Sequence, residues 1–377
     1  MNNEDILVSL LIFLAGIISL EIKVSVAIME IMAGIVAGNF FRLMSSDWID
    51  NMSLFGLLGL MFFAGFETNV NMLKKNWRSS LTIGVSSFLA PFFLVLVSGY
   101  FLLTMEIKEA LLFSIGLSTT SVALLYSIFK EKQLIDSEAQ QLLLSAAMVV
   151  DITSIFALAF IFEGLTALSI LLFVFCILFL AQIPRLGRWL VKRYQSDQIE
   201  FKMRFILLVL LTMVLLSKQA SIHVSLFAFF VGIFFSEFME EDKELVSKLK
   251  SLVFGLMAPI FFFKAGLYVR LISFKWSMLP YVLFLGIVAY LAKFLGTYYS
   301  ARKFLPQKVA KFAGLIFNVR LSFGIIAATF GLESGILRQE MFLTMIFIVV
   351  GASIVTSFLI SHSAKSDVPV AENPLQD

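Results

Sequence analysis

The sequence predicts an all-α integral membrane protein with about thirteen transmembrane helices. Of its 377 residues, 60% are hydrophobic and only 15% are charged, whereas soluble domains contain about 45–50% apolar and about 25% charged residues. Many apolar runs also reach the roughly 20 residues with which a helix crosses a hydrocarbon core. A soluble core could not bury this much apolar surface, but a bilayer can cover it from outside.

The apolar runs predict the spans in order along the chain. The first run lacks a basic segment before it and a small-residue cleavage site after it, so we interpret it as a retained helix and not as a signal peptide. We expect one membrane domain over residues 1–361 and a short polar cytoplasmic tail over 362–377. The thirteen spans are 5–20, 24–41, 52–71, 79–104, 109–129, 139–163, 166–184, 203–218, 222–238, 251–269, 276–301, 309–331 and 339–361.

Lysine and arginine are distributed unevenly between the predicted loops. With the N-terminus placed outside, twenty of them fall on the inner side and six in outer loops. Basic residues accumulate on the cytoplasmic side of membrane proteins. We therefore expect a multi-pass membrane protein with an outer N-terminus and a cytoplasmic C-terminus. We place it in a bacterial inner membrane. The basic residues behind the net charge of +3 set this orientation, so the charge does not indicate a nucleic-acid partner.

This orientation predicts the accessibility of two engineered cysteines in a Cys176→Ser background, because the chain has one cysteine. A cysteine at Ser196 should react with an impermeant maleimide only from the cytoplasm, and a cysteine at Ser273 only from outside. Labelling of intact cells and of inverted vesicles measures both. The reverse pattern would overturn the orientation.

A faint internal repeat links the third and tenth spans. MFFAGFETNV (61–70) and FFFKAGLYVR (261–270) share paired phenylalanines, a small residue, glycine, a bulky apolar residue and valine. The two spans are seven apart in order, an odd number, so the copies run in opposite directions across the membrane. Inverted repeats of this kind are typical of secondary transporters, whose ion sites use discontinuous helices.

Two spans carry polar interruptions that predict such discontinuous helices. The fifth span reads GLSTTSVALL (116–125) and the twelfth reads LIFNVRLSFG (315–324). The hydroxyls of Thr119 and Thr120, together with exposed backbone ends, are candidate ion ligands. Alternatively, the hydroxyls bond back to their own helix, and Arg320 only neutralises carbonyl ends.

Asp151 lies at the centre of the sixth span, with Ser154 one turn further on the same face. A charged residue at this depth costs about 2.5–3.5 kcal/mol on insertion scales, so it indicates a functional site. A buried carboxylate can hold a cation when ionised and release it when protonated, which is the chemistry of proton exchange. The alternative interpretation is a structural ion pair.

Lys293 lies inside the eleventh span, where Gly296 and Thr297 share its face. A buried ammonium requires compensation, so we predict that Lys293 pairs with Asp151; alternatively it reaches the inner surface. Lys264 follows Pro259, which should kink the tenth span, and either extends outward or lines a pathway.

No cofactor or resident metal site is expected. Cys176 has no partner for a disulfide, His223 and His362 are far apart, and the sequence contains neither HExxH nor GxSxG. We therefore do not expect an enzyme. We expect a metal ion to bind only as a transported monovalent cation, near Asp151.

The ordered set of motifs resembles the monovalent cation/proton antiporter-2 family, the Kef-like and bacterial sodium/proton exchanger membrane domains. The resemblance covers essentially the whole membrane portion. Its motifs are GLLGLMFFAGFETNVNMLKKNW (56–77), GLSTTSVALLYSIFKEKQLIDSEAQQLLLSAAMVVDITSIFAL (116–158), APIFFFKAGLYVRL (258–271), AKFLGTYYSAR (292–302) and the looser FNVRLSFGIIAATFG (317–331).

The resemblance implies a homodimer in the lipid bilayer that exchanges Na⁺ or K⁺ for protons by alternating access. It also implies that the fifth and twelfth spans are crossed, broken helices. Asp151 would be the shared cation and proton site, and Lys293 would pair with an acid on the same helix as Asp151. The sequence departs from many relatives in having Val150 where a second acid stands.

Two other classes of function remain open at this stage. An ion channel or gated efflux pathway on the same fold would carry a flux that does not depend on a proton counter-gradient. A diverged, non-transporting membrane partner would agree with the missing second acid.

Overall fold

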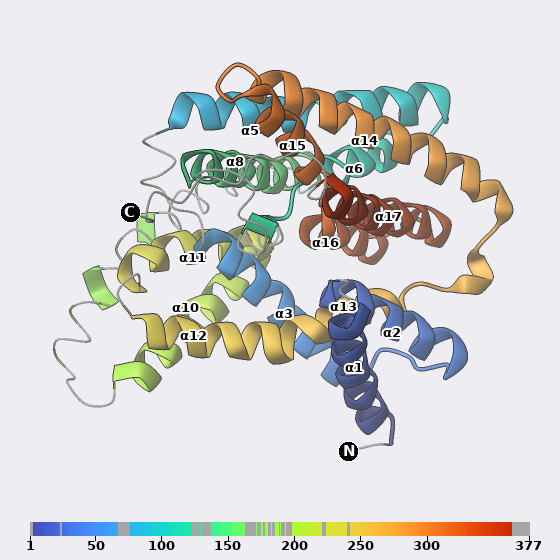
Figure 1. Cartoon of the computed structure of the whole chain (residues 1–377). Helices are drawn as coiled ribbons and strands as arrows, with labels where there is room; N and C mark the ends of the chain where they lie inside the picture. Colours follow the sequence, from blue (N-terminus) through green and yellow to red (C-terminus); the bar gives the residue numbers. More distant parts are fainter. Residues whose placement is uncertain are drawn as a thin grey trace, which may run out of the picture. The chain divides into compact units, whose positions relative to one another are not determined.

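The computed structural model describes residues 3–22, 25–66, 76–122, 125, 128–129, 137–162, a few positions between 171 and 193, 198–220, 224–239 and 242–363. Within these residues every regular element is a helix (Figure 1). The chain forms two compact units. The first unit comprises Met1–Asn69 and Ala159–Leu271, and the second comprises Val70–Leu158 and Ile272–Asp377.

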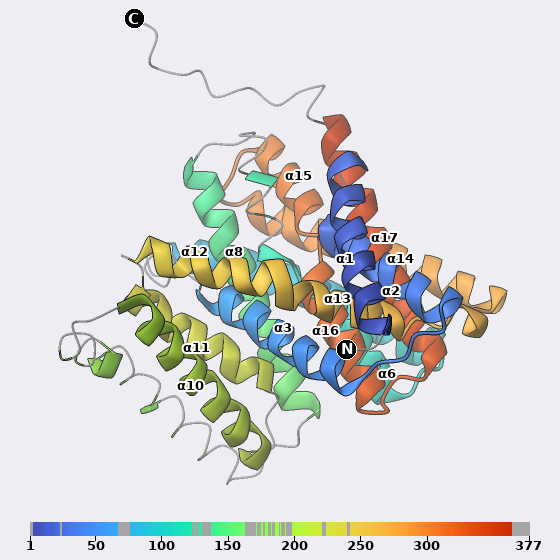
Figure 2. The same cartoon turned by 90° about the horizontal axis from the view of Figure 1, so that it is seen from below.

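The first unit packs α11 and α13 against α3, and α2 against α13 and α1. Figures 1 and 2 show α12 and α13 as one continuous rod beside α3. Its helices are α1 (Asn3–Ile22), α2 (Val26–Phe40), α3 (Asp47–Phe66), α10 (Gln198–Ala220), α11 (Val224–Met239), α12 (Lys243–Leu252), the π-helical turn η2 (Val253–Met257) and α13 (Ala258–Leu267).

The second unit packs α14 along α5, α15 and α17, and α16 against α6 and α17. The short turn η3 (Leu271–Ser273) lies where the chain passes from the first unit to the second. The other elements are α5 (Trp77–Val97), the π-helical turn η1 (Ser98–Leu102), α6 (Ile107–Gly116), α8 (Ser137–Phe162), the short turn η4 (Trp276–Met278), α14 (Leu279–Ala301), α15 (Gln307–Ile316), α16 (Leu321–Glu333) and α17 (Gln339–Ser363).

Twelve of the thirteen predicted spans coincide with helices of the structure. Most of the seventh span and the tail from 364 lie outside the described residues. Seven described helical segments are long and apolar enough to cross a membrane, by length and composition. The shorter helices include the two halves of the twelfth span, α15 and α16, which a break divides.

The tenth span is longer than predicted. The span was predicted over 251–269, but α12, η2 and α13 form one 25-residue helical segment, Lys243–Leu267. The π-helical turn directly precedes Pro259, whose missing N–H and ring interrupt a regular helix. The structure thus places a π-helical turn next to Pro259, where the sequence predicted a kink.

Three elements of the second unit have counterparts later in the chain. A long helix, a short helix that ends at a break and a further long helix appear as α5, α6 and α8, and again as α14, α15 and α17. The short helices end at Gly116 and at Ile316, two hundred positions apart. This recurrence extends the repeat that the phenylalanine-rich segments predicted.

Glycines allow the backbones of α2 and α13 to touch. A methyl group on Gly34 would overlap the carbonyl oxygen of Phe263, and a methyl group on Gly266 would overlap the carbonyl oxygen of Ile31. Small residues permit such close packing in membranes, where dispersion contacts hold helices together.

We expect Gly34→Ala to destabilise the protein by about 1–3 kcal/mol, because the added methyl group forces the two helices apart. Gly16→Ala on α1 is the control, since no atom lies within 4 Å of the methyl group that it adds. The midpoint of thermal unfolding in detergent should fall for the first variant and not for the second. Equal midpoints would show that the α2–α13 contact is not tight.

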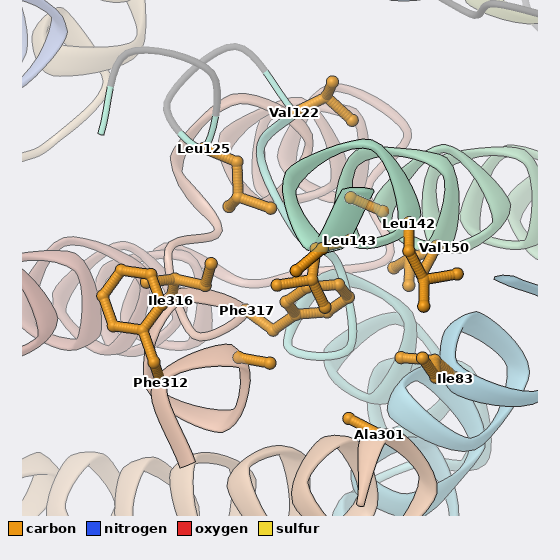
Figure 3. Packing of buried hydrophobic residues seen from close by; sticks show 14 of the residues in the cluster. Ile83, Val122, Leu125, Leu142, Leu143, Val150, Ala301, Phe312, Ile316 and Phe317 are labelled. Carbon is orange, nitrogen blue, oxygen red and sulfur yellow. The ribbon is translucent and has the colours of Figure 1, made fainter. Parts of the chain in front are cut away.

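A cluster of buried apolar residues fills the second unit between α5, α8, α14 and α15. Figure 3 shows Leu143 and Phe317 near its centre, with Val150 and Ile83 at one side. Phe317 belongs to the break after α15, and Val150 directly precedes Asp151. The cluster therefore fixes both the break and the middle of α8.

Candidate functional site: two broken helices and a buried carboxylate

Both predicted breaks are present, and they lie side by side. α6 ends at Gly116 and α15 ends at Ile316, and a short non-helical stretch follows each. The backbone N–H of Ser121 donates to the carbonyl of Val319 at 2.7 Å. The Thr120 hydroxyl donates to the carbonyl of Phe317 at 3.0 Å. The two interrupted helices thus join through hydrogen bonds at their breaks.

Thr119 and Thr120 are buried at the break, as an ion site would require. The Thr119 hydroxyl donates to the carbonyl of Gly116 at 3.0 Å, one turn back. Each threonine therefore satisfies a carbonyl that a helix end leaves without a regular partner. A hydroxyl that donates its proton keeps oxygen lone pairs with which it can accept or coordinate.

Arg320 holds the two breaks together from the N-cap position of α16, and it is fully buried. Its guanidinium donates to the carbonyl of Leu117 and to the side-chain oxygen of Asn318. Weaker hydrogen bonds reach the carbonyls of Asn318 at 3.4 Å and of Ala289 at 3.5 Å. A cation is favourable here because the C-terminal end of α6 carries a partial negative charge.

Lys293 is also fully buried, and it reaches the same break from α14. Its ammonium donates to the carbonyl of Ser118 at 2.5 Å and to the carbonyl of Ser87 at 3.4 Å. Lys293 therefore does not extend to the inner surface, which was the alternative interpretation of the sequence.

Asp151 lies on α8 with a side chain that is almost completely buried. It belongs to the same unit as Lys293 and Arg320. The hydroxyl of Ser154, one turn further, donates to the carbonyl of Val150 at 2.7 Å. The structure thus brings the buried carboxylate of Asp151, two buried cations and two broken helices into one unit.

Lys264 has a role that the sequence did not reveal. Its ammonium forms a 3.0 Å ion pair with Asp50 of α3 and lies 5.3 Å from the ring centre of Tyr268. Glu30 of α2 is a further buried carboxyl group that the sequence interpretation overlooked. Its position inside an apolar span was the available signal.

A multi-pass helical protein with a buried carboxylate and broken helices that meet within one unit has the architecture of a secondary ion transporter. The chain belongs to the sodium/hydrogen exchanger transmembrane family, whose model matches residues 8–365.

Similar proteins are found in both sequence and structure. The probable Na⁺/H⁺ antiporter 3 of Methanocaldococcus jannaschii is 26% identical over 355 residues, which cover 89% of this chain and 90% of that protein. The Na⁺/H⁺-K⁺ antiporter GerN of Bacillus cereus is 25% identical over 368 residues, covering 93% and 92%. The structure of the M. jannaschii sodium proton antiporter MjNhaP1 from an electron-microscopy map shares the fold, with a TM-score of 0.71, 17% identity and 95% coverage of each chain.

Proposed function

We propose that the protein is a secondary transporter that exchanges Na⁺ or K⁺ for protons by alternating access, with Asp151 as the shared site. The observation that carries the proposal is the burial of this carboxylate in the unit that contains both broken helices. An ionised Asp151 would bind a dehydrated cation, and protonation would release it. Competition for one carboxylate couples the two fluxes, because the site holds either a proton or a metal ion.

The surrounding residues have separate roles in this proposal. The oxygens of Thr119, Thr120 and Ser154 would complete the coordination of the cation, since hydroxyl oxygens are suitable ligands for hard cations. Lys293 and Arg320 compensate charge: both bind carbonyls at the broken end of α6. Their positive charges keep Asp151 ionised in a medium that disfavours a lone carboxylate.

The names of similar proteins support Na⁺ or K⁺ and protons as the exchanged ions. The M. jannaschii relative is named a probable Na⁺/H⁺ antiporter, and the name of GerN adds K⁺. Within the exchanger family we assign this chain to the cation/proton antiporter-2, Kef-like branch, on its ordered motifs. We further propose a homodimer in a bacterial inner membrane, with the N-terminus outside and the C-terminus in the cytoplasm.

Proton flux in reconstituted liposomes tests the function. The purified protein is placed in vesicles with an acidic interior and a pH-sensitive dye inside, and Na⁺, K⁺ or Li⁺ is added outside in turn. We expect the internal pH to recover on addition of Na⁺ or K⁺, and not with choline. Cation flux without proton counterflow would show a channel instead, and no flux of either kind would contradict transport.

A further inference from the structure

Helix α5 contains a carbonyl group that has lost its regular partner. Pro91 lies inside α5 and is buried. A helical carbonyl normally accepts from the N–H four residues later, but proline has no N–H. The residue four positions before Pro91 is Ser87, so the Ser87 carbonyl is available to another donor. Buried carbonyls rarely remain without one.

The donor that reaches this carbonyl is Lys293. Its ammonium lies 3.4 Å from the Ser87 carbonyl oxygen and 2.5 Å from that of Ser118, which follows the end of α6. Both acceptors therefore stand at irregularities of a helix, one caused by a proline and one by a break. Both are neutral, so Lys293 makes these two hydrogen bonds without engaging a carboxylate in them.

Two residues next to Lys293 hold α14 against α5 at this level. A side chain on Gly296 would come within 2.6 Å of the Ala90 methyl group and 2.9 Å of the Ser86 carbonyl oxygen, so only glycine permits the approach. One position further, the Thr297 hydroxyl donates to the Ser87 hydroxyl at 2.8 Å. Thr297 and Ser87 are both fully buried.

We propose that Pro91, Ser87 and Thr297 are positioning residues for Lys293. Pro91 frees the Ser87 carbonyl for the ammonium, and the hydrogen bond between Thr297 and Ser87 fixes the distance between the two helices. The consequence for transport rests on the proposed function. An ammonium held by the two carbonyls has a fixed place, whereas a released ammonium can turn to Asp151 and compete with the incoming cation for that carboxylate.

The decisive variant is Pro91→Ala, which returns an N–H to position 91 and so occupies the Ser87 carbonyl. Alanine is a better helix former than proline, so a loss of function cannot be ascribed to a weaker helix. We expect the cation concentration for half-maximal exchange to rise about tenfold, the effect of one hydrogen bond to a charged group.

Pro280→Ala is the matched control. Pro280 lies in the first turn of α14, where a helix leaves its N–H groups without helical acceptors, so its removal restores no hydrogen bond. Thr297→Val removes the hydroxyl at constant shape and should act in the same direction as Pro91→Ala, while Thr297→Ser should retain wild-type behaviour. Thr297→Val also keeps the proposal testable if Pro91→Ala fails to insert.

A double-mutant cycle of Pro91→Ala and Lys293→Gln, measured by thermal unfolding, tests the positioning of Lys293 independently of the proposed function. The measurement does not require transport. We expect non-additive midpoints, since the new N–H at position 91 matters only when the ammonium is present. If the midpoints are non-additive but the protein shows no exchange activity, the positioning of Lys293 is supported and the proposed exchange function is rejected. Additive midpoints would overturn the positioning. Unchanged cation dependence in both Pro91→Ala and Thr297→Val would also overturn it.

Discussion

Asp151→Asn should abolish exchange while leaving a protein that inserts and elutes as the wild type does. The amide has nearly the shape of the carboxylate, but it neither binds a proton near neutral pH nor offers a negative charge to a cation. Because the proposed coupling uses one carboxylate, no partial activity should survive. Recovery of internal pH in liposomes should therefore fall to the rate of empty vesicles with every cation.

Glu138→Gln is the control for this loss, because Glu138 lies in the first turn of the same helix and is exposed. It removes one negative charge from α8 without touching the buried site, and exchange should stay unchanged. If a well-folded Asp151→Asn protein exchanged ions at the wild-type rate, Asp151 would not be the shared site. Equal losses in both variants would point to the total charge of α8 and not to one carboxylate.

The sequence predicted the helices well because membrane insertion leaves a strong local signal. Each span must be apolar over enough residues to cross the bilayer, and each backbone group must be satisfied within its own helix. The polar runs near Thr119 and Asn318 stood out against this background, so both breaks were predictable. The structure adds that the breaks bond to each other, as between Ser121 and Val319.

The partners of the buried charges could not be read from the sequence, because they lie far apart in it. Lys264 pairs with Asp50, a residue at the start of an earlier helix. Lys293 depends on a carbonyl of Ser87, whose availability follows from Pro91. A proline four residues after a serine is visible in the sequence, but its meaning appears only when α14 packs along α5.

Lys293→Gln should be the second most damaging change, in both stability and pH dependence. Glutamine keeps much of the length of the side chain but loses the charge. Each hydrogen bond to a charged group contributes about 1.5–3 kcal/mol, and Lys293 makes two, to Ser118 and Ser87. The loss of a positive charge near Asp151 also favours its protonated form. Exchange should then require a higher pH, because protons compete better with the cation.

Lys303→Gln controls for a change in total charge, since Lys303 is exposed just beyond the end of α14. It should leave the unfolding midpoint and the pH profile unchanged. The predicted pairing of Lys293 with Asp151 is tested by combining Lys293→Gln with Asp151→Asn. When both charges are gone, neither is left buried without its counterpart, so part of the lost stability should return, though not transport. A thermal double-mutant cycle in detergent measures this coupling. Strictly additive midpoints would mean that the two charges do not interact, and that Lys293 acts only on the carbonyls.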